Sequence, residues 1–361
     1  VLGGRNMAIV YDVASLDRYM ATAVDVSNDR PILVDRFLEH AKELDVDCIA
    51  DQTGAVVIGG IMEHIEEAGI HSGDSSCVVP PTGLSERHLA TLRDYTRRMA
   101  RALKVVGLMN VQYALKDDEI FVLEVNPRAS RTIPYLAKAT GVPLAQVAAR
   151  VMMGKTLADL GHTDDLVPAG VFVKSPVFPF IRFPGVDTIL GPEMKSTGEV
   201  MGGAHDFGHA FVKAMLGAGQ RLPEQGTVCL SVNNDDKADV VPIAKALAEM
   251  GFSVIATRGT AVYLRAHGIE CGVVYKVNEG RPNLSDEIVN RRIHLVVNTP
   301  LGLESFFDDK AVRRSAMMAG IPCITTMTGA ASAEQGSRAL KCRDLEVCSL
   351  QEYYETATSS T

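Results

Sequence analysis

The sequence predicts a mixed α/β and α+β protein, in which a mostly antiparallel sheet with helices precedes a doubly wound parallel sheet. The first part shows strand-like runs separated by short turns, two of them joined as a β-hairpin by Asp117-Asp118. From Thr227 onward strands alternate with helices, as in parallel doubly wound sheets. Between them, prolines space short strands, and 217–226 has the composition of a linker. We therefore expect domain boundaries that divide the chain into 1–155, 156–225 and 226–361.

Hydrophobic periodicity and capping residues predict the elements of the first stretch. The expected helices cover 15–24, 85–103 and 143–153. The expected strands cover 31–38, 43–50, 56–63, 107–115 and 119–124, with Phe37 and Leu38 in the core.

The later elements follow from the same patterns. A helix over 205–216 is expected in the second stretch. In the third, strands are expected over 228–232, 253–257, 273–275 and 294–298, with helices over 238–250 and after Thr260. Ligands in such sheets bind beyond the carboxyl ends of the strands, so a site is expected there.

Composition excludes several classes of protein. The chain has 361 residues, 47% of them hydrophobic, and a net charge of −8 with acids and bases mixed along it. A nucleic-acid binder would cluster its basic residues, so no nucleic-acid partner is expected. Seven cysteines without a CxxC pair indicate reduced thiols in a cytoplasmic setting. No apolar run is long enough for a membrane span.

The stretch from Glu124 to Arg128 carries the strongest chemical signal. Residues two apart share one face of a strand, so Glu124, Asn126 and Arg128 are expected to point the same way. Carboxylate and amide oxygens are ligands that Mg²⁺ prefers, and an arginine beside them suits phosphoryl oxygens. The pattern predicts a phosphoryl-transfer site.

The hairpin could add a third ligand, Gln112. If the hairpin loop has an odd number of residues, Gln112 lies opposite Glu124 on the same face. An even loop turns Gln112 to the other face, because a one-residue slip reverses every side chain. A solvent-facing hairpin with merely exposed polar residues is the competing interpretation.

Several long motifs resemble the second ATP-grasp unit of the carbamoyl-phosphate synthase large subunit, and together they cover nearly the whole chain. They are Ile58–Glu66, Gly69–Asp74, Gly107–Gln112, Glu124–Arg131 and Lys138–Ala145. The start, Val1–Arg5, resembles the glycine-rich loop over the ATP phosphates. The resemblance therefore implies a carboxyl-terminal fragment of that subunit, with ATP and Mg²⁺ (or Mn²⁺) as cofactors.

The resemblance also implies roles for individual residues of the first stretch. The nucleotide would be bound by Arg36, Leu38, Glu43, Gly69, Ile70, His71 and Ser72. Gln112, Glu124 and Asn126 would hold the metal against the phosphates. Arg128 and Arg131 would bind carbamate, and with Asn126 they form the expected catalytic set. The implied step converts carbamate and ATP into carbamoyl phosphate and ADP.

The third stretch carries an independent signal for anion binding. Thr257, Thr260, Lys237 and Lys276 fall at strand ends and predict a phosphate-sized site, with Asn298 at a further strand end. The stretch resembles the methylglyoxal-synthase-like regulatory domain of the same family, which implies effectors such as UMP or IMP. Pro300 and Ser175 depart from the family pattern.

The resemblance extends to partners and pathways. Glu66 and Asp74 align with acids that hold ornithine, and Ser175 stands where a further acid is expected. The implied partners are the remainder of the large subunit and a glutaminase small subunit, in arginine and pyrimidine synthesis. Two alternatives stay open: an inert fragment acting only as a nucleotide sensor, and a biotin-carboxylase-like ligase.

Overall fold

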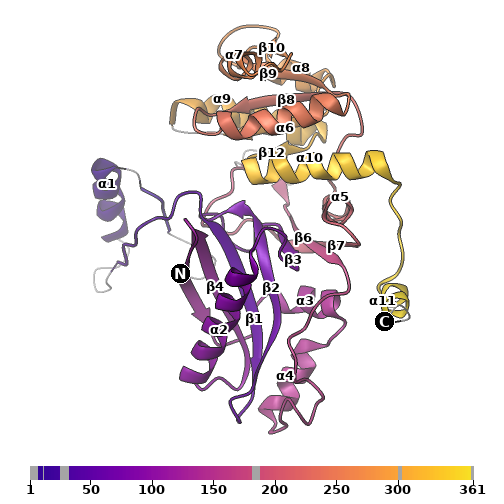
Figure 1. The fold of residues 1–361 in the computed structure, drawn as a ribbon. Coiled ribbons are helices and arrows are strands. Elements are labelled where there is room, and N and C mark those ends of the chain that lie inside the picture. The colour runs from indigo at the N-terminus through magenta and orange to yellow at the C-terminus, as the bar shows by residue number, and fades with distance from the viewer. Residues whose placement is uncertain (1–6, 11, 25–31, 181–187, 300–302, 359–361) are drawn as a thin grey trace.

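The computed structural model describes residues 7–10, 12–24, 32–180, 188–299 and 303–358. Within these residues two sheets lie one above the other, with helices α5 (Phe207–Gly217) and α10 (Met327–Cys342) between them (Figure 1). The lower sheet is antiparallel and the upper sheet is parallel, which confirms the predicted fold class. No described helix combines the length and apolar character needed to cross a bilayer.

The antiparallel sheet has seven strands in the order β5-β4-β1-β2-β3-β6-β7. Their bounds are β1 (Lys42–Ala50), β2 (Val56–Glu67), β3 (Cys77–Val79), β4 (Gly107–Lys116), β5 (Glu119–Asn126), β6 (Val171–Val177) and β7 (Gly198–Ala204). β1 pairs with both β2 and β4, whereas β5 forms the edge and pairs with β4. Residues near 45 and near 112 are thereby brought side by side.

The two faces of this sheet meet different helices. On one face, Leu44, Val46 and Tyr113 pack in a core with α2 (Glu86–Ala102). On the other face, α3 (Ile133–Thr140) and α4 (Leu144–Met152) enclose a core that includes Ile49 and Met62. The acids of β1 alternate with its core residues, so they lie on the same face as α3 and α4.

The hairpin β4–β5 reaches the predicted pairing by an unexpected route. Its turn has two residues, Asp117 and Asp118, both with positive φ as in a two-residue hairpin turn. An even turn alone would have turned Gln112 away from Glu124. Leu123, however, is an extra residue of a β-bulge, and beyond it Gln112 lies opposite Glu124. The predicted pair is confirmed, but the odd turn invoked for it is wrong.

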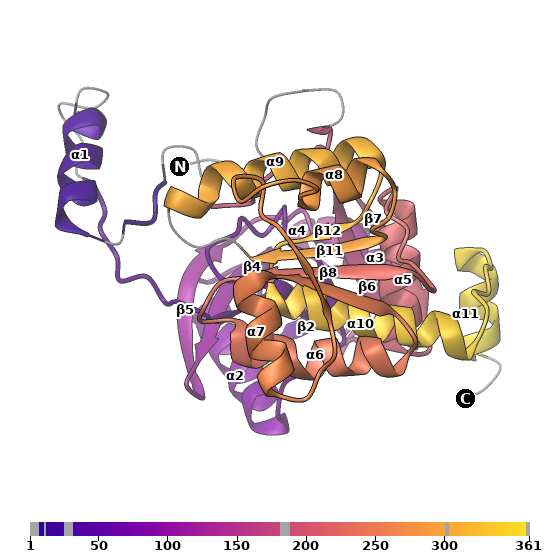
Figure 2. The same ribbon diagram turned by 90° about the horizontal axis from the view of Figure 1, so that it is seen from above.

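The parallel sheet has five strands in the order β10-β9-β8-β11-β12. The strands are β8 (Thr227–Val232), β9 (Ser253–Thr257), β10 (Gly272–Val274), β11 (Leu295–Thr299) and β12 (Cys323–Ile324). Helices α6 (Lys237–Glu249) and α7 (Arg258–Ala266) lie on one side, and α8 (Leu284–Val289) and α9 (Leu303–Ala319) on the other (Figure 2). This is the doubly wound arrangement that the alternation predicted.

Two connections join the sheets. A continuous core contains residues of β2, β6 and α5 together with residues of β8, α6 and α10. The last helix, α11 (Leu350–Thr358), then returns to the antiparallel part. There the Tyr353 ring meets the Phe172 ring edge-on at 5.3 Å, and the Tyr354 hydroxyl donates to the carbonyl of Lys138 in α3.

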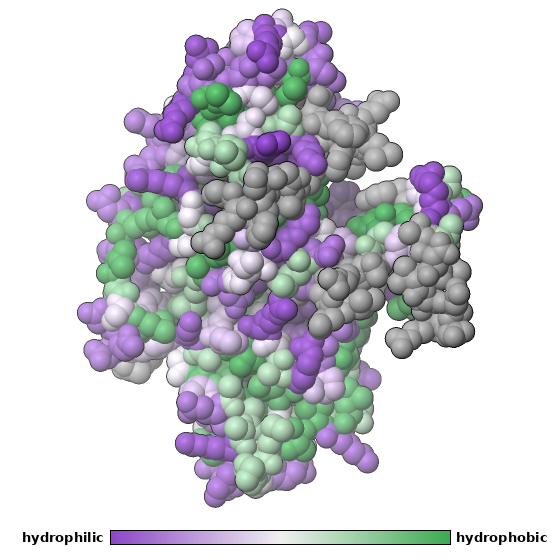
Figure 3. All heavy atoms as spheres, turned by 180° about the vertical axis from the view of Figure 1, so that it is seen from behind, coloured by the Kyte–Doolittle hydropathy of each residue, from purple (hydrophilic) through white to green (hydrophobic). Residues whose placement is uncertain are grey.

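Apolar side chains gather on the surface at the end of the antiparallel part that lies farthest from the parallel sheet (Figure 3). Leu103, Val106, Met152 and Met153 are exposed there, at the adjoining ends of α2, β4 and α4.

One predicted strand is wrong. Residues 32–38 pair with no strand, and Phe37 is 37% exposed instead of lying in the core. The apolar run Ile32-Leu-Val34 suggested a strand, but it forms no backbone pairing with another strand among the described residues.

Other elements were not predicted from the sequence. They are β3, α3, α8, α9, β12, α10 and α11. The helix predicted over 15–24 also begins two residues earlier, since α1 covers Val13–Val24. β3 and β12 are too short for a periodic pattern, and each depends on partners distant in the sequence. The features predicted at Val1–Arg5 and Pro300 lie outside the described residues.

Candidate functional site

A row of polar side chains crosses three neighbouring strands on one face of the antiparallel sheet. Gln112 of β4 lies between Asp45 of β1 and Glu124 of β5. One step along, Asn110 pairs with Asn126. The predicted metal ligands Gln112, Glu124 and Asn126 are therefore brought together, Glu124 exposed and the other two half-buried.

The segment that follows β5 carries the two predicted catalytic arginines. Arg128 bends back, and its Nη2 donates to Asn126 Oδ1 at 3.1 Å, while Nη1 donates to the carbonyl of Ala129 at 3.2 Å. The Arg131 guanidinium contacts the sulfur of Met194. Both arginines are exposed at the end of the polar row. In this arrangement the Asn126 oxygen accepts from an arginine.

Beneath the row lies a buried network that the sequence did not reveal. His64 Nε2 lies 2.8 Å from Asp45 Oδ2, and Asn110 Nδ2 donates to Asp45 Oδ1 at 3.2 Å. Burial opposes ionisation of Asp45, but the hydrogen bond and charge of His64 outweigh it, so the pKa of Asp45 is lowered. Lys174 is 2% exposed, and its Nζ donates to the carbonyl of Ser72 at 3.2 Å.

Glu43, predicted to bind the nucleotide, belongs to this network. It is 6% exposed, and its Oε2 lies 4.0 Å from Nδ1 of His64. Burial raises the pKa of Glu43 to about 7, although His64 and Lys174 act in the opposite direction. The signal in the sequence was the alternation of acids at 43, 45 and 47, which places three carboxyls on one face of a strand.

The predicted nucleotide segment 69–72 lies beside the row. Ser72 Oγ accepts from Gln112 Nε2 at 3.1 Å, which ties the segment to β4. Gly69 has φ +107 and faces the ring of Phe37. His71 is half-buried, its Nδ1 accepts from the backbone of Gly73, and burial lowers its pKa. Ile70 is half-buried as well.

The two acids predicted to hold an effector bond to backbone groups. Asp74 is fully buried, and its two oxygens accept from the backbone nitrogens of Lys195 at 2.7 Å and Ser196 at 2.9 Å. Glu66 Oε2 accepts from the nitrogen of Ser76 at 2.6 Å, and burial raises the pKa of Glu66.

Arg36 and Leu38 lie in the unpaired segment before β1, where Arg36 is exposed and Leu38 is half-buried. Within the described residues, no side-chain hydrogen bond or ion pair ties Arg36 or Leu38 to the polar row. Several of the predicted site residues between Glu43 and Arg131 are thus connected by hydrogen bonds near the row, whereas Arg36 and Leu38 lie in a segment without such bonds to the row among the described residues.

The residues predicted to bind an anion lie near the carboxyl ends of strands of the parallel sheet. Thr257 and Thr260 are buried, with hydroxyls 3.4 Å apart, and Lys237 Nζ donates to Asn234 Oδ1 at 2.7 Å. Asn298 is 1% exposed on β11, and Lys276 is half-buried just after β10. Thr257 and Asn298 lie at the carboxyl ends of β9 and β11, Lys276 follows β10, and Lys237 and Thr260 lie in the first turns of α6 and α7.

A buried arginine beside this cluster was not anticipated. Arg313 of α9 is 2% exposed, and its Nη1 donates to Asn298 Oδ1 at 3.4 Å. A charged residue within an unassigned helix gives no sequence signal for such burial.

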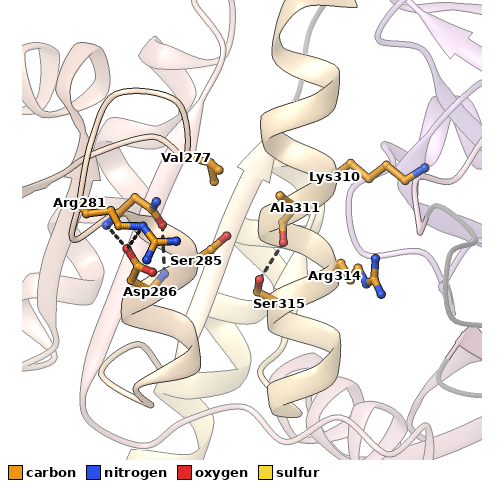
Figure 4. A pocket seen from close by; sticks show the side chains of 9 residues that line it. Val277, Arg281, Ser285, Asp286, Lys310, Ala311, Arg314 and Ser315 are labelled. Carbon is orange, nitrogen blue, oxygen red and sulfur yellow. Dashed lines mark hydrogen bonds and ion pairs between the residues drawn. The ribbon is translucent and has the colours of Figure 1, made fainter.

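A separate surface cavity of about 420 Å³ lies between α8 and α9. Ser285 and Asp286 line it from α8, while Lys310 and Arg314 extend from α9 away from them (Figure 4). Arg281 lies beside Asp286, with 3.8 Å between Nε and Oδ2. None of the predicted effector residues lines this cavity.

Comparisons with known proteins give two family matches and several relatives. The family model for the carbamoyl-phosphate synthase L chain, ATP binding domain, matches residues 1–160, and the MGS-like domain model matches residues 239–325. A biotin carboxylase domain of the Hydrogenobacter thermophilus 2-oxoglutarate carboxylase has 15% identity and a TM-score of 0.45, over 58% of this chain and 52% of that chain.

Two curated relatives are much more similar in sequence. The carbamoyl phosphate synthase large chain of Acidobacterium capsulatum is 55% identical over 97% of this chain and 33% of the relative. The large chain of Synechocystis sp. is 54% identical over 98% of this chain and 33% of the relative. The chain thus spans about a third of the length of these relatives. Both domain models are thus matched in order along this chain, which is similar over nearly its full length to about a third of the length of carbamoyl phosphate synthase large chains.

Proposed function

We propose that this chain phosphorylates carbamate with ATP to give carbamoyl phosphate and ADP, as part of a carbamoyl phosphate synthase large chain. The observation that carries the proposal is the polar row on β4 and β5, in which Gln112 faces Glu124 and Asn110 faces Asn126. Arg128 and Arg131 follow at its end. Carboxylate and amide oxygens thus lie near the Arg128 guanidinium, and this supports a site for transfer of a phosphoryl group.

The donor set suits Mg²⁺ bound together with ATP. The described residues contain no group of three or more His, Cys, Asp and Glu side chains arranged to hold a metal ion. Mg²⁺ is usually held by one or two carboxylates, with phosphates and water completing its shell. Glu124, with the amide oxygens of Gln112 and Asn126, would supply such a partial shell. When bound, the ion would neutralise charge on the phosphate oxygens.

The residues of the chain would act by positioning and by charge. Arg128 and Arg131 would orient carbamate and stabilise the charge that develops on the transferred group. Arg128 would have to exchange its bond to Asn126 for one to substrate. Glu43, Gly69, Ile70, His71 and Ser72, with Arg36 and Leu38, would bind the nucleotide. No protein nucleophile is required, because alignment supplies much of the rate.

The test is the reverse reaction, synthesis of ATP from ADP and carbamoyl phosphate by the 361-residue chain. Glu124→Gln should lower its rate at least about 100-fold, equivalent to about 2.7 kcal/mol or more, because it removes the one charged side chain among the three proposed ligands of Mg²⁺. Glu119→Gln is the matched control, because Glu119 is exposed at the other end of β5. Equal rates for the two variants, or an inactive wild type, would refute the proposal.

We propose a second function, nucleotide sensing by the parallel-sheet domain, supported by the cluster at its strand ends. Lys237, Thr257, Thr260, Lys276 and Asn298 would hold the phosphate of an effector such as UMP or IMP. Calorimetric titration with UMP and with IMP tests this function. Lys276→Ala should weaken binding about tenfold, whereas Lys245→Ala, an exposed lysine of α6, should not change it.

The wider setting follows from the family. We propose that the chain functions in the cytoplasm with the remainder of the large chain and a glutaminase small subunit, in arginine and pyrimidine synthesis. Ornithine is a further proposed effector at Glu66 and Asp74. Mn²⁺ is proposed as a substitute for Mg²⁺.

A further inference from the structure

Asp47, in the middle of β1, bonds to the segment that carries the two arginines. Its side chain is buried, and the residue is 1% exposed. Ser130 Oγ donates to Asp47 Oδ1 at 2.7 Å, and Thr132 Oγ1 donates to Asp47 Oδ2. The two hydroxyl oxygens lie 2.7 Å from each other. One carboxylate therefore connects two side chains of the segment to the centre of the sheet.

Burying the Asp47 carboxylate costs free energy, because a charged group loses its hydration when it is removed from water. Burial raises the pKa of Asp47 to about 6, while the hydrogen bonds from Thr132 and Ser130 act against this rise. The two larger of these compensating hydrogen bonds come from Thr132 and Ser130 in the arginine segment, and a smaller one comes from Asn110 of the adjoining strand β4. The buried Asp47 carboxylate therefore links β1 to this segment through two side-chain hydrogen bonds.

Thr132 shows that the link competes with local structure. It stands at the N-cap of α3, where a threonine hydroxyl normally accepts from a backbone N–H of the first turn. Here Thr132 makes no side-chain capping bond, and its hydroxyl donates to Asp47. The first helical residue, Ile133, has a long backbone bond of 3.5 Å to Ser130. The segment between Arg128 and α3 is therefore held chiefly through Asp47 among the described residues.

We propose that Asp47 is a positioning residue for the reaction. By holding Ser130 and Thr132, its carboxylate fixes the backbone on both sides of Arg131 and directly after Arg128, and so sets where the two guanidinium groups stand relative to the polar row. The role rests on the proposed function, in which these arginines bind carbamate.

The test compares variants of the 361-residue chain that remove either the donor or the acceptor of the hydrogen bond between Thr132 and Asp47. Thr132→Val keeps the shape and removes the donor, whereas Thr132→Ser keeps the donor. Asp47→Ala removes the acceptor from the other side. Thr140→Val is the matched control, because the Thr140 hydroxyl donates to the carbonyl of Leu136 within α3. Two readouts are needed: amide hydrogen exchange of residues 128–136 by mass spectrometry, and kcat and KM for ATP synthesis from carbamoyl phosphate.

Thr132→Val and Asp47→Ala should raise exchange of 128–136 about tenfold or more, with exchange in β2 changed less than about twofold. Both should lower kcat/KM for carbamoyl phosphate about tenfold or more and leave KM for ADP within about twofold. Thr132→Ser should recover most of both properties. Wild-type exchange in Thr132→Val, or loss of activity in Thr132→Val and Thr132→Ser alike, would overturn the proposal.

The exchange readout needs no turnover. An inactive wild type would refute the proposed function, and the link from Asp47 to the segment would then stand or fall on exchange alone. Local loosening confined to 128–136 supports the link. Loosening spread over the whole sheet in all three variants would show a general structural role and refute a positioning one.

Discussion

Replacing Asp74 by alanine tests how the segment over Arg131 is held. Asp74 is fully buried, and its two oxygens accept from the backbone nitrogens of Lys195 and Ser196. Met194, next in the chain, contacts the Arg131 guanidinium. Asp74→Ala therefore leaves two backbone donors without their acceptor and releases the segment that packs on Arg131.

The size of the effect follows from the two bonds. A hydrogen bond to a charged acceptor contributes about 1.5–3 kcal/mol, so two such bonds contribute about 3–6 kcal/mol. Loss of the desolvation cost of the carboxylate offsets part of this, which leaves a net destabilisation of about 3 kcal/mol. For a domain of about 150–250 residues this lowers Tm by about 6–12 °C. Asp74→Asn keeps one acceptor oxygen, and about half the loss is expected.

Calorimetry on purified variants measures the shift. Asp94→Ala serves as control, since the Asp94 side chain is 60% exposed on α2 and forms an exposed ion pair with Arg98 at 3.5 Å. Its Tm should stay within about 2 °C of wild type. If Asp74→Ala unfolds at the same temperature as Asp94→Ala, the assignment of Asp74 as the anchor of 194–196 is wrong.

Three further predictions concern other buried contacts. Tyr113→Phe should lower the free energy of unfolding in urea by about 1–2 kcal/mol, because it strands the buried hydroxyl of Thr96 that lies 2.7 Å away. Gly60→Ala should cost about 1–3 kcal/mol in the same assay, because the new Cβ would lie 2.5 Å from a methyl carbon of the buried Leu136. Glu43→Gln should gain stability relative to wild type between pH 5 and pH 8. Burial raises the pKa of Glu43 from 4.5 to about 7, so the wild type loses stability as pH rises through that window and the variant does not.

The predictions for Gly60 and Glu43 each have a specific outcome that would contradict them. Gly198→Ala is the control for Gly60→Ala, because nothing lies within 4 Å of the Cβ added there. Equal effects of the two substitutions would contradict the close contact with Leu136. A difference between Glu43→Gln and wild type that stays constant with pH would contradict the raised pKa.

The hairpin shows how far local pattern could go. The alternation around Glu124 predicted the strand, and the acidic pair predicted the turn, but the register depended on one residue. The turn has two residues, and the bulge at Leu123 restores the pairing of Gln112 with Glu124. A bulge leaves no distinct mark in the sequence, because Leu123 is as strand-compatible as its neighbours.

The buried network could not be predicted from local sequence pattern. The acids of β1 were visible as an alternating run, yet only Glu43 was given a role. Asp45 acquires His64 from β2 and Asn110 from β4, and Asp47 acquires Ser130 and Thr132 from the segment before α3. These partners lie between 19 and 85 residues away in the chain, so no window of sequence contains them.

The sequence by itself determined the two kinds of sheet, the order of the domains and the polar faces of β4 and β5, because hydrophobic period and turn residues act over a few neighbouring positions. Only the tertiary structure decided which carboxyls are buried, which of their oxygens are already bonded, and how the arginine segment is held. Those properties depend on desolvation and on distant donors, which exist only once the strands have paired.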